Sequence, residues 1–182
     1  MQQNILIGGT GGQGILAAGE FLSEALFRAG YEVMYTRSYG SEARGGSCRS
    51  EVIFSDSEIY DLQVGEVDVL IILSAAALRR HLGRAKSGAM VLVDADALAD
   101  AGGDVVGVGV EIISVPATEI AVGLGNRIVA NMVLLGALAR RSGFVSLDLL
   151  RQTVEETMRP SMRDVNMRAL DAGYGRGQSS SP

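Results

Sequence analysis

The sequence predicts a single α/β domain that begins in the manner of a Rossmann fold. The chain has 182 residues, which is the usual size of one domain. Its first 36 residues alternate strand, glycine turn, helix and strand. Apolar residues make up 47% of the chain, but only 5% are aromatic and none is Trp. Small aliphatic side chains must therefore build the core, which suits helices packed closely on a sheet.

The first predicted unit is a strand, a helix and a second strand. Residues 3–8 are short, apolar and ended by glycines, as in a buried strand. Residues 14–28 repeat apolar side chains at helical spacing, and Gly30 follows as a stop signal. Residues 31–36 form the second strand. Because parallel strands need a long crossover, this order predicts a right-handed βαβ unit.

The rest of the chain continues the alternation. Further strands are predicted at residues 48–55, 67–73 and 89–93, with one or two short strands within 105–115. Helices are predicted at residues 75–86, 94–100, 118–123, 128–141, from Ser146 onward, and 162–172, with Lys86 as a charge at the end of the first. From Gly173 the chain loses periodicity. We therefore expect one domain over residues 1–174 and a flexible tail over residues 175–182.

Composition excludes several classes of function. The chain carries 21 acidic and 16 basic residues, a net charge of −5, whereas a nucleic-acid surface needs the opposite sign. One Cys is too few for an iron–sulfur cluster held within the chain, and one His excludes a multi-histidine metal site. The longest apolar stretches fall short of the roughly 20 residues of a membrane helix. We expect a cytoplasmic protein with no targeting segment and no membrane or nucleic-acid partner.

A glycine motif follows the first strand directly. Residues 9–14 fit the pattern G-x-G-x-x-G, in which backbone N–H groups and a helix N-terminus approach a phosphate. No acidic residue ends the second strand, which argues against a dinucleotide, and no Gly-Lys-Ser/Thr follows, which excludes a P-loop. The motif is either a structural tight turn or a site for another phosphate or a partner chain. Its candidate residues are Gly9, Gly11, Gly12, Gln13 and Gly14.

A second unusual segment is the polar loop over residues 37–47. Loops of this length within a compact domain are usually functional or mobile. Its candidate contact residues are Tyr39, Gly40, Glu42, Arg44, Gly45 and Gly46. The alternative is a solvated loop with a local ion pair between Glu42 and Arg44.

The remaining polar residues give no complete catalytic constellation. Cys48 has no His at a motif-like spacing and is interpreted as a small buried hydrophobe. Asp94 and Asp96 follow a strand, where caps and turn residues are common. Asn126 is a natural helix N-cap. Asn131 is unusual among apolar neighbours, unless its side chain bonds across an interface or to a loop.

Three segments together resemble the gamma subunit of the 2-oxoacid:ferredoxin oxidoreductases. They are residues 11–15 (Gly-Gly-Gln-Gly-Ile), residues 39–46 (Tyr-Gly-Ser-Glu-Ala-Arg-Gly-Gly), and residues 125–127 (Gly-Asn-Arg) leading to Asn131, Met132 and Gly136. The resemblance covers roughly residues 4–174. It implies a three-layer α/β/α domain with a mostly parallel, mixed central sheet.

The resemblance also implies a function. Such complexes decarboxylate a 2-oxoacid on thiamine diphosphate and Mg²⁺, pass electrons through iron–sulfur clusters to ferredoxin, and transfer the acyl group to coenzyme A. The gamma subunit is implied to bind none of the tightly held cofactors itself. It is implied to pack on alpha and beta subunits, with a ferredoxin-like delta subunit as a further partner. The isolated chain is then expected to be inactive.

Site residues and substrate follow as expectations from the same resemblance. The glycine turn is implied to contact a coenzyme A phosphate or another subunit. The implied interface consists of the loop residues together with Asn126, Arg127 and Asn131. An exposed apolar patch is expected near the turn and the loop over residues 39–47. For the substrate we rank 2-oxoglutarate first, then 2-oxoisovalerate and pyruvate, with indolepyruvate as a further alternative. The competing class is a stand-alone Rossmann-like nucleotide-binding or regulatory domain.

Overall fold

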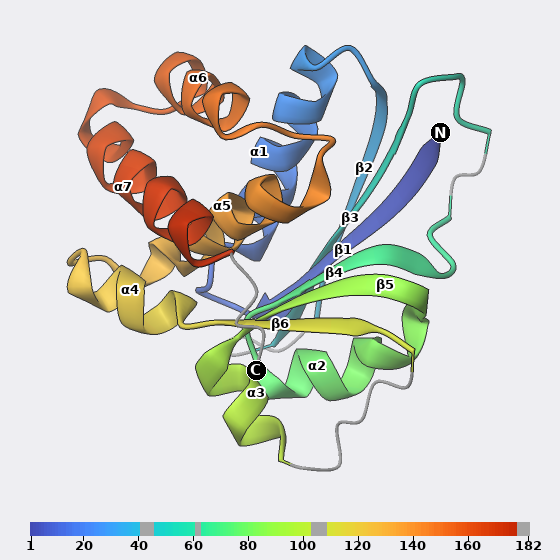
Figure 1. The fold of residues 1–182 in the computed structure, drawn as a ribbon, viewed down its shortest axis with the longest axis horizontal. Helices are drawn as coiled ribbons and strands as arrows, with labels where there is room; N and C mark the ends of the chain where they lie inside the picture. Colours follow the sequence, from blue (N-terminus) through green and yellow to red (C-terminus); the bar gives the residue numbers. More distant parts are fainter. Residues whose placement is uncertain (41–45, 61–62, 103–108, 178–182) are drawn as a thin grey trace.

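A six-stranded mixed sheet forms the centre of the computed structural model (Figure 1). The structure describes residues 1–40, 46–60, 63–102 and 109–177. The strand order is β2-β3-β1-β4-β5-β6, in which β1, β4, β5 and β6 run parallel and β3 runs antiparallel to both of its neighbours. The strands are β1 (Gln2–Thr10), β2 (Glu32–Tyr39), β3 (Ser47–Ser55), β4 (Val67–Ile72), β5 (Ala85–Asp94) and β6 (Glu111–Val115).

Helices cover both faces of the sheet and complete three layers (Figure 1). On one face lie α1, α4 and α5, with α6 and α7 packed outside them, and on the other lie α2 and α3. The helices are α1 (Ile15–Arg28), α2 (Ala75–His81), α3 (Ala95–Ala101), α4 (Ala117–Gly123), α5 (Ala130–Ser142), α6 (Leu147–Thr157) and α7 (Pro160–Arg176), with 3-10 turns η1 (Leu82–Arg84) and η2 (Arg127–Val129). The predicted α/β/α class with a mixed sheet is confirmed.

The first unit differs from a simple βαβ unit. Although β1 and β2 point the same way, β3 lies between them and is antiparallel to both. The reason is that β2 and β3 form a hairpin, so that β3 returns beside β1 and pairs with it from Gln2↔Ser55 to Thr10↔Ser47. The predicted βαβ unit therefore has an antiparallel strand inserted between its two parallel strands.

Helix α2 is shorter than the sequence predicts. It ends at His81, and the chain passes through η1 into β5, which begins at Ala85. Lys86 therefore lies in a strand, and the prediction that it ends a helix is wrong. Its ammonium donates to Asp68 Oδ1 at 2.7 Å, next to the pairing of Ala85 with Val67 that starts the β4–β5 ladder.

Helix α7 is longer than the sequence predicts. It runs to Arg176, past Gly173, where the sequence analysis ended the regular pattern. The end of α7 is stabilised by packing on α5 rather than by helix propensity. A Cβ at Gly173 would overlap the carbonyl of Val133 in α5. In the same way, a Cβ at Gly136 would overlap the carbonyl of Leu170 in α7. The two helices thus cross backbone to backbone, which only glycine at the crossing permits.

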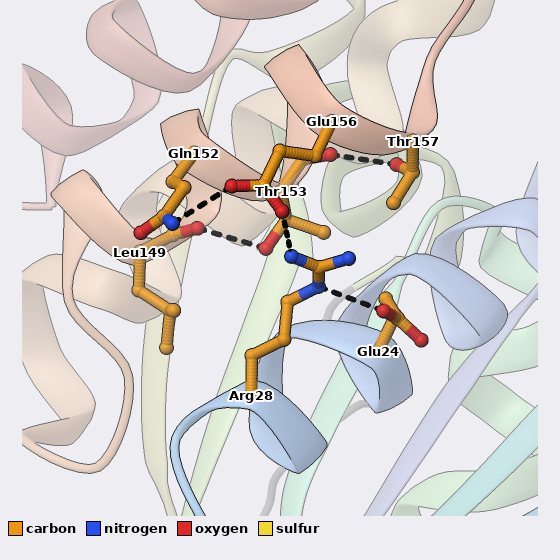
Figure 2. A network of polar contacts seen from close by, with 7 residues as sticks. All are labelled: Glu24, Arg28, Leu149, Gln152, Thr153, Glu156 and Thr157. Atoms are coloured by element: carbon orange, nitrogen blue, oxygen red, sulfur yellow. Dashed lines mark hydrogen bonds and ion pairs between the residues drawn. The ribbon is translucent and has the colours of Figure 1, made fainter.

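A polar network ties α6 to the end of α1 (Figure 2). Arg28 donates from Nε to Glu24 Oε1 at 2.7 Å and also pairs with Glu156, whose other oxygen accepts from Gln152. These ion pairs are exposed, so we assign most of the packing of α6 to its buried apolar face rather than to the network.

Candidate functional site

The glycine turn lies at the carboxyl end of β1, the edge of a parallel sheet where ligands of α/β proteins usually bind. Gly14 precedes α1 in the left-handed conformation, with φ 69° and ψ 25°. Gly12 has φ 94°, and a Cβ added there would meet nothing within 4 Å. Gly11 and Gly12 are exposed, whereas Gly9 is buried under Gln13 and Ile15. The exposed part of the turn is therefore bare backbone.

The Gln13 side chain folds inward and fixes the turn. Its Oε1 accepts from the Thr10 backbone N–H at 2.7 Å and from the Thr10 hydroxyl at 3.1 Å. Its Nε2 donates to the Leu73 carbonyl at 2.7 Å, just past the end of β4. Both ends of the amide are thus engaged within the chain, so Gln13 supports the shape of the turn and leaves outside contacts to the backbone.

The structure brings the polar loop against the glycine turn. The Gly11 N–H donates to the Gly46 carbonyl at 3.0 Å, and the Gly40 N–H donates to the Ser47 carbonyl at 2.8 Å. Tyr39, at the end of β2, is 67% exposed. The predicted contact residues Glu42, Arg44 and Gly45 lie outside the described residues.

Asn131 joins the turn to α5. Its Nδ2 donates to the Gly14 carbonyl at 3.0 Å, and its Oδ1 accepts from the Met132 N–H at 2.7 Å. Of the two explanations that the sequence left open, the bond to a loop is the one observed. Asn126 caps η2, as predicted, by accepting from the Ile128 N–H at 3.1 Å. Arg127 is exposed beside it.

A cavity of about 200 Å³ opens beside Gly14, between α1, α5 and the junction of α6 with α7. We call it the methionine groove, and its main lining residues are Gly14, Ile128, Met132, Met158, Arg159 and Met162. Ile128 is 53% and Met162 is 40% exposed. The predicted apolar surface beside the turn is therefore present. Its α6–α7 side was not predicted, because residues 158–162 reach the turn only through the packing of α7 on α5.

Two polar residues from the sequence analysis have structural roles. Asp94 is buried and accepts from the Thr118 N–H at 3.0 Å and from the Thr118 hydroxyl at 2.5 Å, so it caps the first turn of α4. Cys48 is half-buried and packs against the core on the α1 side. Neither residue joins a catalytic group in the described part of the chain.

His81 is a buried group that the sequence analysis did not single out. It is 2% exposed, packs against Gly8, and its Nε2 has no hydrogen-bond partner among the described residues. Burial lowers the pKa of His81 to about 4, with further lowering by the nearby guanidinium groups of Arg84, Arg49 and Arg80. The imidazole is therefore neutral near pH 7.

The donor set does not fit the metal centres of the resembled complexes. An iron–sulfur cluster needs several thiolates, and the chain contains one Cys. Among the described residues no group of three or more His, Cys, Asp or Glu side chains is placed to hold a metal ion. No helix in the described part of the chain is long and apolar enough to cross a membrane. No reaction step is therefore assigned to a metal on this chain.

Comparison with known proteins places this chain in a family. Residues 4–176 match the family described as pyruvate ferredoxin/flavodoxin oxidoreductase. The chain belongs to that family. A relative in Methanothermobacter thermautotrophicus, 2-oxoglutarate synthase subunit KorC, is 36% identical over 178 residues, covering 95% of this chain and 94% of the relative. Indolepyruvate oxidoreductase subunit IorB of Pyrococcus horikoshii is 30% identical, with 94% of each chain covered.

Two solved structures have the same fold as this chain. The gamma subunit of a keto/oxoacid ferredoxin oxidoreductase from Geobacter sulfurreducens matches with a TM-score of 0.80 and 30% identity, covering 96% of this chain and 98% of that one. A 2-oxoglutarate:ferredoxin oxidoreductase from Magnetococcus marinus, with 2-oxoglutarate, coenzyme A and succinyl-CoA bound, matches with a TM-score of 0.81 at 24% identity. That match covers 97% of this chain and 31% of the other, and it concerns the fold alone.

The comparisons confirm the coarse part of the functional prediction. The chain is a gamma-type member of the 2-oxoacid ferredoxin oxidoreductase family, whose members are subunits of oxidoreductase complexes. The roles of the individual site residues stay predictions.

Proposed function

We propose that this chain is the gamma subunit of a 2-oxoglutarate:ferredoxin oxidoreductase. In this proposal the complex decarboxylates 2-oxoglutarate oxidatively, transfers the acyl group to coenzyme A and passes the electrons to ferredoxin. The observation that carries the choice of substrate is the 36% identity to a 2-oxoglutarate synthase subunit over 95% of the chain, against 30% to an indolepyruvate oxidoreductase subunit. Thiamine diphosphate and the iron–sulfur clusters are assigned to the alpha, beta and delta partners.

The substrate assignment is tested on the assembled complex. The complex is purified from its own cells through a tag on this chain and assayed with 2-oxoglutarate, 2-oxoisovalerate, pyruvate and indolepyruvate, with viologen as electron acceptor. We expect 2-oxoglutarate to give the highest kcat/KM. A higher kcat/KM for any of the other three oxoacids would overturn the substrate assignment but not the membership of the family. An isolated chain that binds a nucleotide and no partner would instead support a stand-alone nucleotide-binding domain.

The glycine turn is assigned to coenzyme A within this proposal. Gly12 exposes backbone at the carboxyl edge of the sheet and has open space where a side chain would be, whereas the Gly11 N–H already donates to the Gly46 carbonyl. Such a turn lets a phosphate approach N–H groups that a side chain would screen. The fold neighbour from Magnetococcus marinus, whose structure has coenzyme A bound, is consistent with this role.

A charge placed at Gly12 tests that role. Gly12→Glu and Gly12→Gln share the same shape and the same backbone strain at φ 94°, but only Glu adds a negative charge. If a phosphate lies at the turn, the KM for coenzyme A is higher by about 10-fold in the Glu variant than in the Gln variant, with the KM for the oxoacid unchanged. Equal KM values for coenzyme A in the two variants would remove the turn from the coenzyme A site.

A further inference from the structure

The methionine groove has the chemistry of a protein interface. Met132, Met158 and Met162 supply flexible, polarisable side chains that adapt to different partners. Methionine and arginine are both enriched at the centres of protein interfaces, where acids and lysine are depleted. No acidic side chain lines the groove within the described part of the chain.

The size of the groove argues against a cofactor. Sites for small-molecule ligands usually measure roughly 300–1,000 Å³. The groove holds about 200 Å³, which is too small for the whole of a nucleotide or coenzyme A. It suits one apolar side chain, of the kind that anchors a protein contact in a well-packed pocket.

The rim of the groove is basic in a chain whose net charge is −5. Arg159 lines the groove, and Arg127 is exposed next to Ile128. Neither arginine forms an ion pair with any described residue. A free guanidinium pairs best with a carboxylate, which it can bind through two donors.

From these observations we propose that the methionine groove is the socket for an apolar side chain of another subunit of the complex, on a segment that also carries a carboxylate for Arg159. This inference rests on the proposed function, because it requires that the chain assembles with other subunits. The occupant is a protein segment rather than a lipid, a second copy of this chain or the arm of coenzyme A. Burial of Ile128 and Met162 then accompanies assembly.

A cross-linking experiment on the complex tests the socket. A photoreactive phenylalanine analogue replaces Met162 in the tagged chain, and Phe27 is replaced in the matched control. Phe27 is also a large exposed apolar side chain, 66% exposed, but it lies at the opposite end of α1 from Gly14. The complex is irradiated, and the cross-linked peptides are identified by mass spectrometry.

We expect the probe at position 162, and not that at position 27, to link to an apolar segment with an adjacent Asp or Glu in another subunit. We also expect Met162→Glu and Arg159→Glu each to lower the affinity of this chain for the other subunits at least about 10-fold, whereas Phe27→Glu leaves that affinity unchanged. Three results in an assembled complex would overturn the socket while leaving the proposed function. Position 162 could link to nothing, it could link to a second copy of this chain, or its link could be lost when coenzyme A is added. A wild-type chain that assembles with no subunit would overturn both.

Discussion

At the scale of single residues, the site depends on the contact between Asn131 and Gly14. The Asn131 side chain donates to the carbonyl of Gly14, which precedes α1, so the turn and α5 hold each other in place. A Cβ at Gly14 would lie 2.5 Å from Asn131 Nδ2 and 3.3 Å from Ile128 Cγ2. The glycine is therefore needed both for its left-handed backbone and for the space that Asn131 occupies.

This contact predicts a difference between two glycines of the same turn. Gly12→Ala adds only the cost of a left-handed non-glycine residue, about 1–2 kcal/mol in the free energy of unfolding. Gly14→Ala adds the same cost and also displaces Asn131 from its hydrogen bond, for a further loss of about 1–3 kcal/mol. Chemical denaturation of the two variants measures the difference.

The Asn131→Ala background is the control for that comparison. If the clash with Asn131 causes the extra loss, the difference between the two glycine variants shrinks when Asn131 is truncated, because the sites are coupled. If the difference between Gly12→Ala and Gly14→Ala is as large in the Asn131→Ala background, the contact with Asn131 does not cause it.

His81 predicts a specific pH dependence of stability. Its folded-state pKa of about 4 lies below the ordinary value of 6.5, so the unfolded chain binds the proton first as the pH falls. The contribution of the neutral, buried His81 to the free energy of unfolding is complete above pH 6.5 and is lost as the pH falls toward 4. Between pH 7 and pH 5 the loss amounts to about 2 kcal/mol.

The measurement compares wild type with His81→Gln by denaturation at pH 7 and pH 5. Gln does not titrate, so the variant's stability should depend less on pH over this window, whatever its stability at pH 7. An equal loss of stability in both proteins would mean that another group titrates, and that the environment of His81 does not depress its pKa.

At the scale of elements, the crossing of α5 and α7 positions the methionine groove. Gly136 and Gly173 allow the two backbones to touch, and this contact brings Met158 and Met162 to the turn. The crossing also explains what the sequence could and could not predict. The apolar stretch over residues 128–139 identified α5, and Ser146 correctly marked the start of α6, where its hydroxyl accepts from the Leu149 N–H.

The end of α7 could not be predicted in the same way. Gly173 and Gly175 lower helix propensity, and local spacing contains no information about the neighbouring helix that outweighs them. For the same reason the sequence identified the Gly14 turn and Asn131 as unusual but not the groove that both residues line. The position of β3 was missed because its place in the sheet depends on pairing with β1, about 45 residues earlier in the chain.

The crossing predicts opposite effects for two glycines of α7. Gly173→Ala forces α7 away from Val133 and should destabilise the chain by about 1–3 kcal/mol. Gly175→Ala places its methyl group in open space within the helix and should stabilise it by about 0.5–1 kcal/mol. Thermal denaturation of both variants is the test, and equal shifts in Tm would contradict the close crossing.

At the scale of the whole molecule, the features point to a subunit rather than a complete catalyst. The turn presents backbone, the groove beside it presents methionines and Arg159, and the single Cys cannot hold a cluster. The network of Figure 2 and the two apolar cores stabilise the domain without contributing a reactive group in its described part. We therefore propose that the chain contributes to a reaction by assembly and positioning.

Purification of the native complex through a tag on this chain tests that claim most directly. The account predicts co-purification of separate subunits that contain thiamine diphosphate and iron–sulfur clusters, with 2-oxoacid-dependent reduction of ferredoxin in the presence of coenzyme A. It also predicts that the chain purified alone has no such activity. A chain that purifies from its own cells without these subunits, or that alone carries iron and sulfide in stoichiometric amounts, would contradict the account.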